Sequence, residues 1–344
     1  MRLAYVLFLA AFAADAFAAE PYHQREDVRA FVADLAGREG LDADELLAHF
    51  RKVKRSPPVL KAIRPTADPG VRSWHAYRSR FVEGQRIARG LEFWHRHEAT
   101  LARAEATYGV PAEIVVAIIG VETYYGRQTG HFDTFNALAN LAFDYPPRAE
   151  LFRGELEALL LLAHAESRSP WRYRGSYAGA IGLPQFLPSS VRQWAVDFDG
   201  DGRIDLARSP DDAIGSVAHF LAEHGWARDE PITLPAKVSS DGTPSLLAEG
   251  IVPTRLPAQM AEFGVECYDA PAMPAALIDL ASPAAPTEYR LGFNNFYVLT
   301  RYNRSSFYAA AVTDLAETLR AVHRPATTTQ AALSPPPVPE TAPR

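Results

Sequence analysis

The sequence contains a single cysteine, Cys267, among 344 residues. An intrachain disulfide is therefore excluded, even in an oxidising compartment. A catalytic thiol would need a neighbouring base, and the residues from Val265 to Pro271 supply no obvious one. We expect Cys267 to be a small apolar filler of the interior.

The charged residues form no basic stripe. Lysine and arginine number 35 against 41 aspartates and glutamates, which gives a formal net charge of -6. We expect no nucleic-acid partner, because no row of positive charge is available to neutralise phosphates. The histidines also lack the helical zinc spacing, since neither His95 with His97 nor His219 with His224 fits it. The sequence shows no internal repeat of fixed period.

The first 19 residues have the pattern of a secretory signal. Arg2 precedes an almost wholly apolar run from Leu3 to Ala14, and Ala16-Phe17-Ala18 gives the small-x-small pattern that signal peptidase needs. The run is too short to span a bilayer comfortably, and no nearby cysteine could carry a lipid anchor. The alternative is a buried N-terminal helix. The pattern predicts an exported, soluble protein without a transmembrane segment after signal removal.

Length and composition indicate a globular protein of two or three subdomains. A chain of 344 residues exceeds the size at which a single hydrophobic core usually keeps growing. Its content of 48% apolar and 22% charged residues is ordinary for a soluble protein. Apolar residues recur at helical spacing over most of the chain. The predicted helical ranges are Arg25–Ala62, Trp74–Tyr108, Ala112–Tyr125, Thr134–Phe143, Arg148–Ser167, Ser189–Ala195, Asp211–His224 and Asn295–Val322.

The residue pattern changes between Glu230 and Tyr289, where proline, glycine and serine interrupt short apolar runs. This pattern favours strands. The tail from Arg324 to Arg344 has no periodicity and is rich in proline, threonine and alanine, which predicts disorder. The expected fold class is mainly α, of the α+β type, with one small β-rich part.

Glu122 is the most informative carboxylate. It lies in a segment from Val110 to Gly126 that begins with a proline and ends with a glycine, as helices often do. It follows Val115, Ile118 and Ile119 by seven, four and three residues, so it projects from the apolar face that these residues form.

A carboxylate on an apolar face has two physical solutions. It pairs with a cation, for which Arg127 or another arginine is available, or burial raises its pKa so that it keeps its proton. A carboxylic acid that is protonated near neutral pH can protonate the leaving oxygen of a glycosidic bond. The helix alone leaves a structural ion pair and a catalytic acid equally open.

Three motifs resemble the lytic murein transglycosylase B family: IGVETYYG at Ile119–Gly126, SYAGAIGLPQFLPSS at Ser176–Ser190 and FNNFYVLTRYN at Phe293–Asn303. The resemblance runs from about Phe31 to Leu319. It implies a lysozyme-like core with an additional helical domain and a small β-rich domain. The expected division is a signal peptide at 1–19, an N-terminal helical domain at 20–110, the core with a cation loop at 111–228, the β-rich domain at 229–290, a helical segment completing the cleft at 291–323 and a disordered tail at 324–344.

The resemblance also implies the chemistry. Glu122 matches the family's catalytic acid/base, which protonates the bond between N-acetylmuramic acid and N-acetylglucosamine and then accepts a proton from the muramoyl C6 hydroxyl. The product carries a 1,6-anhydro ring, and no water is consumed. An ordinary glycosidase needs a second carboxylate, and the other two motifs contain neither aspartate nor glutamate. In the family the substrate's acetamido group is held to stabilise the positive charge, and catalysis needs no cofactor.

Six further positions match family residues that line the cleft: Ser176, Gln185, Phe186, Tyr302, Asn303 and Tyr308. Aromatic faces stack on sugar rings, and amides or hydroxyls bind sugar hydroxyl and acetamido groups. The alternative for each is a place in the core or in a turn. Three glycines between Gly175 and Gly182 permit a tight turn in either case.

The segment Asp197–Asp205 resembles the opening of an EF-hand calcium loop. Oxygen ligands stand at positions one, three, five and nine, glycine stands at six and Arg203 stands at seven, where the backbone carbonyl serves. Arg208 replaces the closing glutamate at position twelve. The family's loop is longer, and Asp212 matches its closing carboxylate, with Asp211 as a substitute. The expected calcium ligands are Asp197, Asp199, Asp201, Arg203 and Asp212, and the alternative is a solvated acidic turn.

The sequence thus predicts a periplasmic lytic transglycosylase that acts on peptidoglycan glycan strands and carries a structural calcium ion. Two alternatives remain. One is a hydrolytic muramidase of the same fold. The other is a non-catalytic peptidoglycan-binding protein, which the intact motif around Glu122 disfavours.

Overall fold

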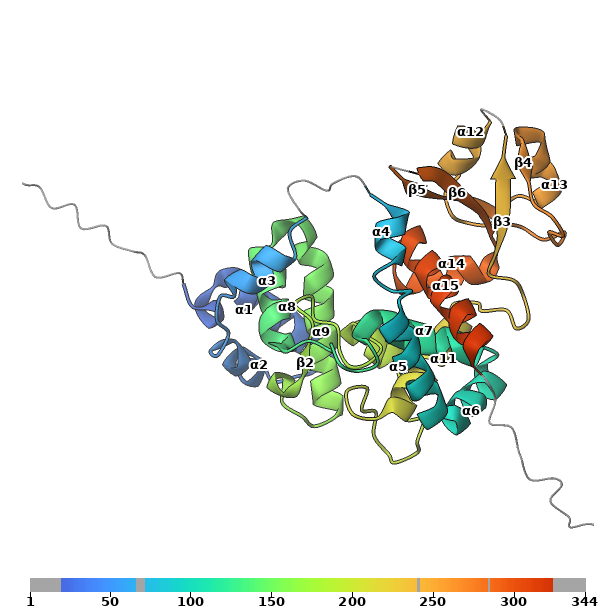
Figure 1. Cartoon of the computed structure of the whole chain (residues 1–344). Helices are drawn as coiled ribbons and strands as arrows, with labels where there is room; N and C mark the ends of the chain where they lie inside the picture. The colour runs from blue at the N-terminus through green and yellow to red at the C-terminus, as the bar shows by residue number, and fades with distance from the viewer. Residues whose placement is uncertain (1–19, 66–71, 240–241, 284, 324–344) are drawn as a thin grey trace, which may run out of the picture. The chain divides into compact units, whose positions relative to one another are not determined.

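The computed structural model describes residues 20–65, 72–239, 242–283 and 285–323 (Figure 1). The expected signal peptide at 1–19 and the expected tail at 324–344 lie outside the described residues. Contacts divide the chain into two units. The first takes its described residues from 1–65, 130–180 and 187–192, and the second from 66–129, 181–186 and 193–344. The chain therefore passes between the units several times.

The first unit is built from helices around an aromatic core. Phe50 packs edge-on against Phe135 at 5.2 Å and against Phe143 at 6.1 Å, and Phe31 covers Phe143 from α1. Its helices are α1 (Glu26–Glu39), α2 (Ala43–Phe50), α3 (Pro57–Ala62), α8 (Thr134–Asp144), α9 (Ala149–Ala165) and most of α10 (Pro188–Trp194). A two-stranded ribbon pairs β1 (Phe132–Asp133) with β2 (Arg174–Gly175), and the short 3₁₀ helices are η1 (Tyr22–Gln24), η2 (Pro146–Arg148) and η3 (Pro170–Arg172).

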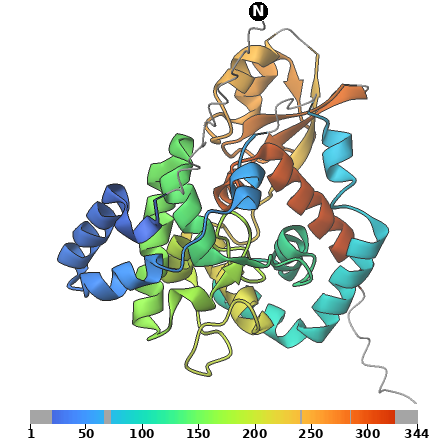
Figure 2. The same cartoon turned by 90° about the vertical axis from the view of Figure 1, so that its left-hand side faces the viewer.

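The helical part of the second unit surrounds α7. Helices α15, α5, α6 and α11 all pack against it, and both views show α15 alongside it (Figures 1 and 2). The helices are α4 (Trp74–Arg78), α5 (Gly84–Arg96), α6 (Glu98–Tyr108), α7 (Ala112–Thr123), α11 (Pro210–Glu223), α14 (Asn294–Tyr302) and α15 (Ser306–Val322).

The second unit also contains an antiparallel sheet in the order β4-β3-β6-β5. Its strands are β3 (Thr233–Val238), β4 (Val265–Glu266), β5 (Ala276–Ser282) and β6 (Ala285–Gly292), and α12 (Thr243–Ala248), α13 (Pro257–Met260) and η4 (Ala261–Phe263) accompany them. Leu246, Met260 and Phe293 lie in its buried core, and Cys267 packs against that cluster while remaining partly exposed. The strands predicted after Glu230 are present, with short helices between them.

A buried carboxylate ties this sheet to α15. Asp314 is 6% exposed, and it accepts from Arg290 of β6 at 2.6 Å and from Arg78 of α4 at 2.5 Å. Two guanidinium partners compensate the cost of burying the charge, and removing either would leave an unpaired group inside. The network fixes α15 against α4 and the sheet, which matters because α15 carries one side chain of the site.

Three of the predicted helical ranges are broken. The range Arg25–Ala62 forms α1, α2 and α3, because Gly40 ends α1 in the left-handed conformation and Asp42 caps α2. The range Trp74–Tyr108 forms α4, α5 and α6, because the carboxylate of Glu83 caps α5 and the chain leaves helical geometry at His97. The range Asn295–Val322 breaks after Tyr302, where Ser305 caps α15 by accepting from the Tyr308 N–H. Periodicity alone does not reveal such internal caps.

Contacts divide the segment 20–110, which the sequence predicts to be one helical domain, near residue 65. The part after residue 65 belongs to the second unit, which also contains α14 and α15. The described residues include no single helix that is long and apolar enough to cross a membrane, and only the pair α6 and α7, bent by 114°, meets the length and composition criteria jointly.

Candidate active site

Helix α7 ends in three left-handed residues. After Thr123, the φ angles are 52° at Tyr124, 59° at Tyr125 and 82° at Gly126. The N–H groups of Tyr124 and Tyr125 donate to Gly120 and Ile119, which satisfies the last carbonyls of the helix. The sequence predicts that the helix ends at Gly126, but the left-handed turn begins two residues earlier. Tyr124 and Tyr125 adopt it, and for a tyrosine this conformation is strained. Strain of this kind directly after Glu122 is typical of a functional site.

Every face of α7 is buried, not only one stripe. Val116 and Ala117 are as fully covered as Val115 and Ile118. The inference that Glu122 shares a distinct apolar face was therefore incomplete, because the helix is apolar on all sides up to Gly120. Glu122 lies where this burial ends, and it is partly exposed. Its environment combines an apolar helix behind it with access to solvent.

Burial raises the pKa of Glu122 to about 7, against a partial opposing effect of its one hydrogen-bond partner. That partner is Tyr308 of α15, whose hydroxyl donates to Oε1 at 2.7 Å. Within the described part of the chain Glu122 forms no ion pair, and Arg127 is exposed. Of the two solutions open to such a carboxylate, the described residues show a raised pKa and no arginine pair.

An aromatic group stands beside the carboxylate. The ring of Tyr302 stacks on that of Tyr308 at 6.3 Å with an interplanar angle of 11°, and the Tyr302 hydroxyl donates to the Pro184 carbonyl at 2.6 Å. Phe186 packs against Tyr302 at 5.8 Å but is only 2% exposed. In this structure Phe186 supports Tyr302 from behind and presents no free face to a ligand.

Gln185 lies in a tight turn next to the end of α7. Its φ is 52°, and its amide nitrogen donates to the carbonyls of Gly182 and Thr129. The hydroxyl of Thr123 donates to the Leu183 carbonyl at 2.9 Å, so the residue after Glu122 fastens this turn to α7. The arrangement leaves the amide oxygen of Gln185 as the group available to a ligand.

Two of the expected residues, Asn303 and Ser176, lie outside the group formed by Glu122, Tyr302, Tyr308 and Gln185. Asn303 is exposed at the break between α14 and α15. Ser176 belongs to the other unit, where its hydroxyl accepts from the N–H groups of Ala178 and Ala180 and closes the glycine-rich turn. The structure therefore brings Glu122, Tyr302, Tyr308 and Gln185 together within one unit, and describes Ser176 separately.

Tyr77 is a residue that the sequence reasoning missed. Its pKa is raised by burial and then by the negative charge of Glu122, and its ring packs on Phe307 at 5.7 Å. It lies on α4, a five-residue helix with no motif around it. No pattern in one sequence distinguishes such a tyrosine from an ordinary core residue.

The acidic loop brings three of its expected ligands together. One carboxylate oxygen each from Asp197, Asp199 and Asp212 lies within 4.8 Å of the others. Asp212 is 1% exposed, and burial raises its pKa. Asp211 accepts from the Thr100 hydroxyl instead, so Asp212 is the closing carboxylate in this structure.

Asp201, Gly202 and Arg203 take part in the hydrogen bonds that shape the turn. Asp201 accepts from the Arg203 N–H at 2.8 Å, and its carboxylate is not part of the three-carboxylate cluster found among the described residues. Asp197 accepts from Gly202, the sixth position, at 2.8 Å. The oxygen donors fit a hard divalent cation such as Ca²⁺, which prefers carboxylate and carbonyl ligands.

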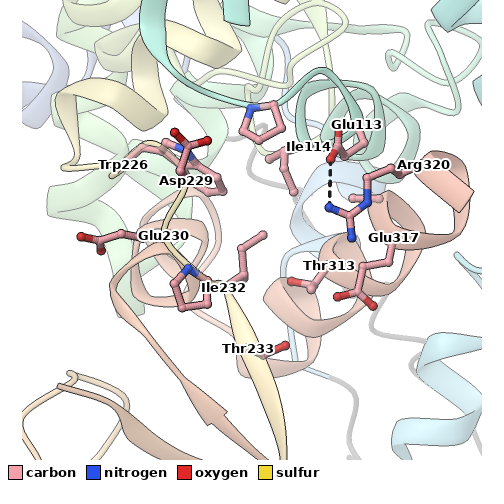
Figure 3. Close-up of a pocket in the computed structure, with 13 residues that line it drawn as sticks. Glu113, Ile114, Trp226, Asp229, Glu230, Ile232, Thr233, Thr313, Glu317 and Arg320 are labelled. Carbon is pink, nitrogen blue, oxygen red and sulfur yellow. Dashed lines mark ion pairs between the residues drawn. The ribbon is translucent and has the colours of Figure 1, made fainter. Parts of the chain in front are cut away.

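A separate cavity of about 450 Å³ lies at the opposite end of α7 (Figure 3). Glu113 and Arg320 form an ion pair at 3.7 Å on its wall, and Trp226, Asp229 and Glu230 lie across from them. Glu113 precedes Glu122 by nine residues, which is about 14 Å of helix rise. This cavity is therefore distinct from the site of Glu122.

Comparison with known proteins agrees with this geometry. Residues 23–317 match the family model described as the transglycosylase SLT domain. The chain is 38% identical over 302 residues to the membrane-bound lytic murein transglycosylase B of Escherichia coli K12, covering 83% of this chain and 81% of that one. The chain belongs to the lytic murein transglycosylase family. Its relatives are enzymes that act on peptidoglycan, and the mainly helical fold expected from the sequence is confirmed.

Two solved structures extend the comparison. The soluble lytic transglycosylase SltB1 of Pseudomonas aeruginosa is 44% identical, with a TM-score of 0.80 over 86% of this chain and 99% of that chain. The lytic transglycosylase SLT35 of E. coli, in complex with calcium, is 37% identical, with a TM-score of 0.75 over 89% of this chain and 95% of that chain. The family thus includes one protein named membrane-bound, one named soluble and one solved with calcium.

Proposed function

We propose that Glu122 is the catalytic acid/base of this lytic transglycosylase. The supporting observation is a carboxyl with a pKa of about 7, bonded to Tyr308 and paired with no cation within the described residues. At neutral pH a large fraction of such molecules carries the proton needed by a leaving oxygen. A carboxylate held in an arginine pair would remain ionised and could not donate.

Glu122 acts twice in the reaction. It first gives its proton to the glycosidic oxygen as the bond from the muramoyl C1 breaks, so the N-acetylglucosamine leaves as an alcohol. It then accepts the proton of the muramoyl C6 hydroxyl while that oxygen bonds to C1 and closes the 1,6-anhydro ring. The carboxyl is regenerated, and no water enters. The Tyr308 hydroxyl donates to the carboxylate in the ionised interval and stabilises it.

A single carboxylate supports the anhydro product over hydrolysis. Within the described part of the chain the hydrogen-bond partner of Glu122 is Tyr308 and not a second carboxylate, and the two other motifs contain neither aspartate nor glutamate. A hydrolytic enzyme would place another carboxylate across the bond to activate water or attack C1. Mass spectrometry of digested sacculi separates the two outcomes, because the anhydro product is lighter by one water. A reducing muramoyl end would show a muramidase instead.

The site residues then have distinct roles. Tyr302 and Gln185 bind the sugar through a ring face and an amide oxygen, and Ser176 and Asn303 add polar contacts. Phe186 acts through Tyr302, which it supports. The experiment that tests the assignment is Glu122→Gln, which removes the titrating proton and keeps the shape. We expect the variant to bind glycan strands and to release no product, whereas retained turnover would sink the assignment.

The acidic loop binds a structural Ca²⁺ through Asp197, Asp199 and Asp212, with the Arg203 carbonyl and Asp201 completing the set. Its three converging carboxylates support this role, as does the relative solved with calcium. The enzyme is exported and acts in the periplasm, where peptidoglycan lies. Neither role places the cation in the reaction.

A further inference from the structure

Arg86 of α5 is a partly buried cation without a carboxylate partner. Burial lowers the pKa of its guanidinium, and among the described residues it forms no ion pair. Its Nε is buried and has no hydrogen-bond partner within the same residues. Removing a cation from water without a counter-charge costs free energy, so the groups that the guanidinium does contact must offset that cost.

The guanidinium joins two backbone segments near the acid. Helix α5 packs against α7 (Figure 1), and Nη1 donates to the carbonyl of Gly120 in the last turn of α7. Nη2 donates to the carbonyl of Arg80 at 3.2 Å, in the connection between α4 and α5. Gly120 precedes Glu122 by two residues, and Arg80 follows Tyr77 by three. The carbonyls at the end of a helix carry partial negative charge, so a cation is stabilised there.

The same guanidinium covers the strained turn that follows α7. It lies 4.6 Å from the ring centre of Tyr124 and 5.3 Å from that of Phe81. The Tyr124 N–H also donates to the carbonyl of Gly120, so one oxygen accepts from the turn and from the arginine. Tyr125 fits against the same helix, because a Cβ at Gly90 would lie 2.5 Å from its hydroxyl oxygen. Helix α5 therefore holds both left-handed tyrosines, one with an arginine and the other with the space at a glycine.

We propose that Arg86 is a positioning residue for Glu122, which holds the last turn of α7 in the conformation that shields the carboxyl from water. The proposal rests on the proposed function, because it takes Glu122 as the acid. Arg86 acts through the Gly120 carbonyl and the Tyr124 ring. Left-handed tyrosines are strained and persist only where the surrounding contacts impose them. Without the guanidinium the turn relaxes, and water reaches Glu122.

The kinetic test replaces Arg86 by glutamine and by lysine. Arg86→Gln removes the charge-assisted bond to the turn and should lower kcat by about tenfold. KM should change less, because the substitution touches no group that binds the sugar. Arg86→Lys keeps the charge but not the fork that reaches two carbonyls, so it should retain more activity than glutamine. Rates are measured on folded enzyme, below the melting transition of each variant, and an unaltered kcat in Arg86→Gln overturns the proposal.

The pH profile is a readout that a loss of stability does not move. Burial raises the pKa of Glu122, so water admitted by a relaxed turn should lower it toward the usual value of a glutamate. The alkaline limb of kcat/KM in Arg86→Gln should therefore lie at lower pH than in the wild type. Simple loss of a nearby positive charge would move it to higher pH. The titratable groups that face Glu122 include Tyr77, Tyr302 and Tyr308, and burial and then the charge of Glu122 raise the pKa of all three. The substitution alters none of them, and a limb that stays in place or moves to higher pH overturns the proposal.

Arg89 of the same helix gives a matched control. Its guanidinium lies 5.3 Å from the ring centre of Tyr124, but across the described residues it forms no hydrogen bond or ion pair. Arg89→Gln removes a cation from the same ring and leaves the bond to Gly120 in place, so kcat and the limb should keep their wild-type values. Equal losses in the two glutamine variants reject the positioning role. Turnover by Glu122→Gln would instead reject the proposed function, whatever the variants of Arg86 do.

Discussion

Tyr308 donates a 2.7 Å hydrogen bond to Glu122 across 186 positions of the sequence. The bond joins the C-terminal end of α7 to the first turn of α15, and α15 is itself fixed through Asp314 to Arg78 and Arg290. Glu122 is therefore held by a partner that favours its ionised form, in surroundings that favour its neutral form. Burial has the larger effect, and the pKa of about 7 is the result.

The first prediction concerns the pH dependence of cleavage. The proton on Glu122 is lost as pH rises through about 7, so kcat/KM should fall about tenfold per unit on the alkaline side. Initial rates on purified sacculi between pH 5 and 9 measure this limb. A rate that stays level from pH 6 to 9 would contradict a general acid with this pKa.

The second prediction concerns Tyr308→Phe. Removing the hydroxyl removes the interaction that lowers the pKa of Glu122, so the alkaline limb should move to higher pH. The ionised intermediate also loses its donor, so kcat at the optimum should fall by about tenfold. Tyr302→Phe is the matched control, because its lost hydroxyl bonds to the Pro184 carbonyl and not to Glu122. A limb that moves equally in both variants would show a general effect of the aromatic pair.

The third prediction concerns stability. The pKa of Glu122 is about 7 in the folded chain against 4.5 for an unperturbed glutamate, so the folded state binds more protons and loses stability between these values as pH rises. Glu122→Gln removes this penalty. With allowance for the partial exposure of Glu122, we expect the free energy of unfolding of the variant to exceed that of the wild type by about 2 kcal/mol at pH 8 and to equal it at pH 4. Denaturant unfolding at both pH values measures the difference, and an equal effect at both would refute it.

Much of this arrangement follows from sequence, and the reasons for the remainder are physical. Glu122 and Tyr302 stand in long motifs and Tyr308 follows the third motif by five residues, so the resemblance pointed to all three. Tyr77 could not be found, because its short helix carries no motif and only the tertiary fold brings it near Glu122. The burial of Phe186 and the break before Ser305 also depend on contacts distant in sequence.

The fourth prediction concerns the turn after Glu122. A Cβ at Gly120 would lie 2.6 Å from the hydroxyl oxygen of Tyr125 and 2.7 Å from the nearest atom of its ring. Gly120→Ala should therefore cost about 1–3 kcal/mol in unfolding free energy and lower kcat by displacing the strained turn. Gly154→Ala in α9 is the matched control, since nothing lies within 4 Å of its Cβ position, and it should stabilise slightly. Equal stability of the two variants would show that the turn adapts freely.

The fifth prediction concerns the calcium loop. Saturating EDTA should lower Tm without changing the cleavage products, because the cation stabilises the fold and takes no part in the reaction. Asp212→Asn should abolish the difference between Tm with and without calcium, since it removes a carboxylate of the three-residue cluster. Identical melting curves with calcium and with EDTA in the wild-type protein would remove the calcium assignment.

The catalytic role of Glu122 is tested by digesting purified sacculi with wild-type enzyme and with Glu122→Gln and weighing the muropeptides by mass spectrometry. We expect 1,6-anhydro muramoyl ends from the wild type and no cleavage from the variant. Anhydro ends released at an undiminished rate by Glu122→Gln would contradict the role of Glu122, and reducing ends released by the wild type would contradict the anhydro product.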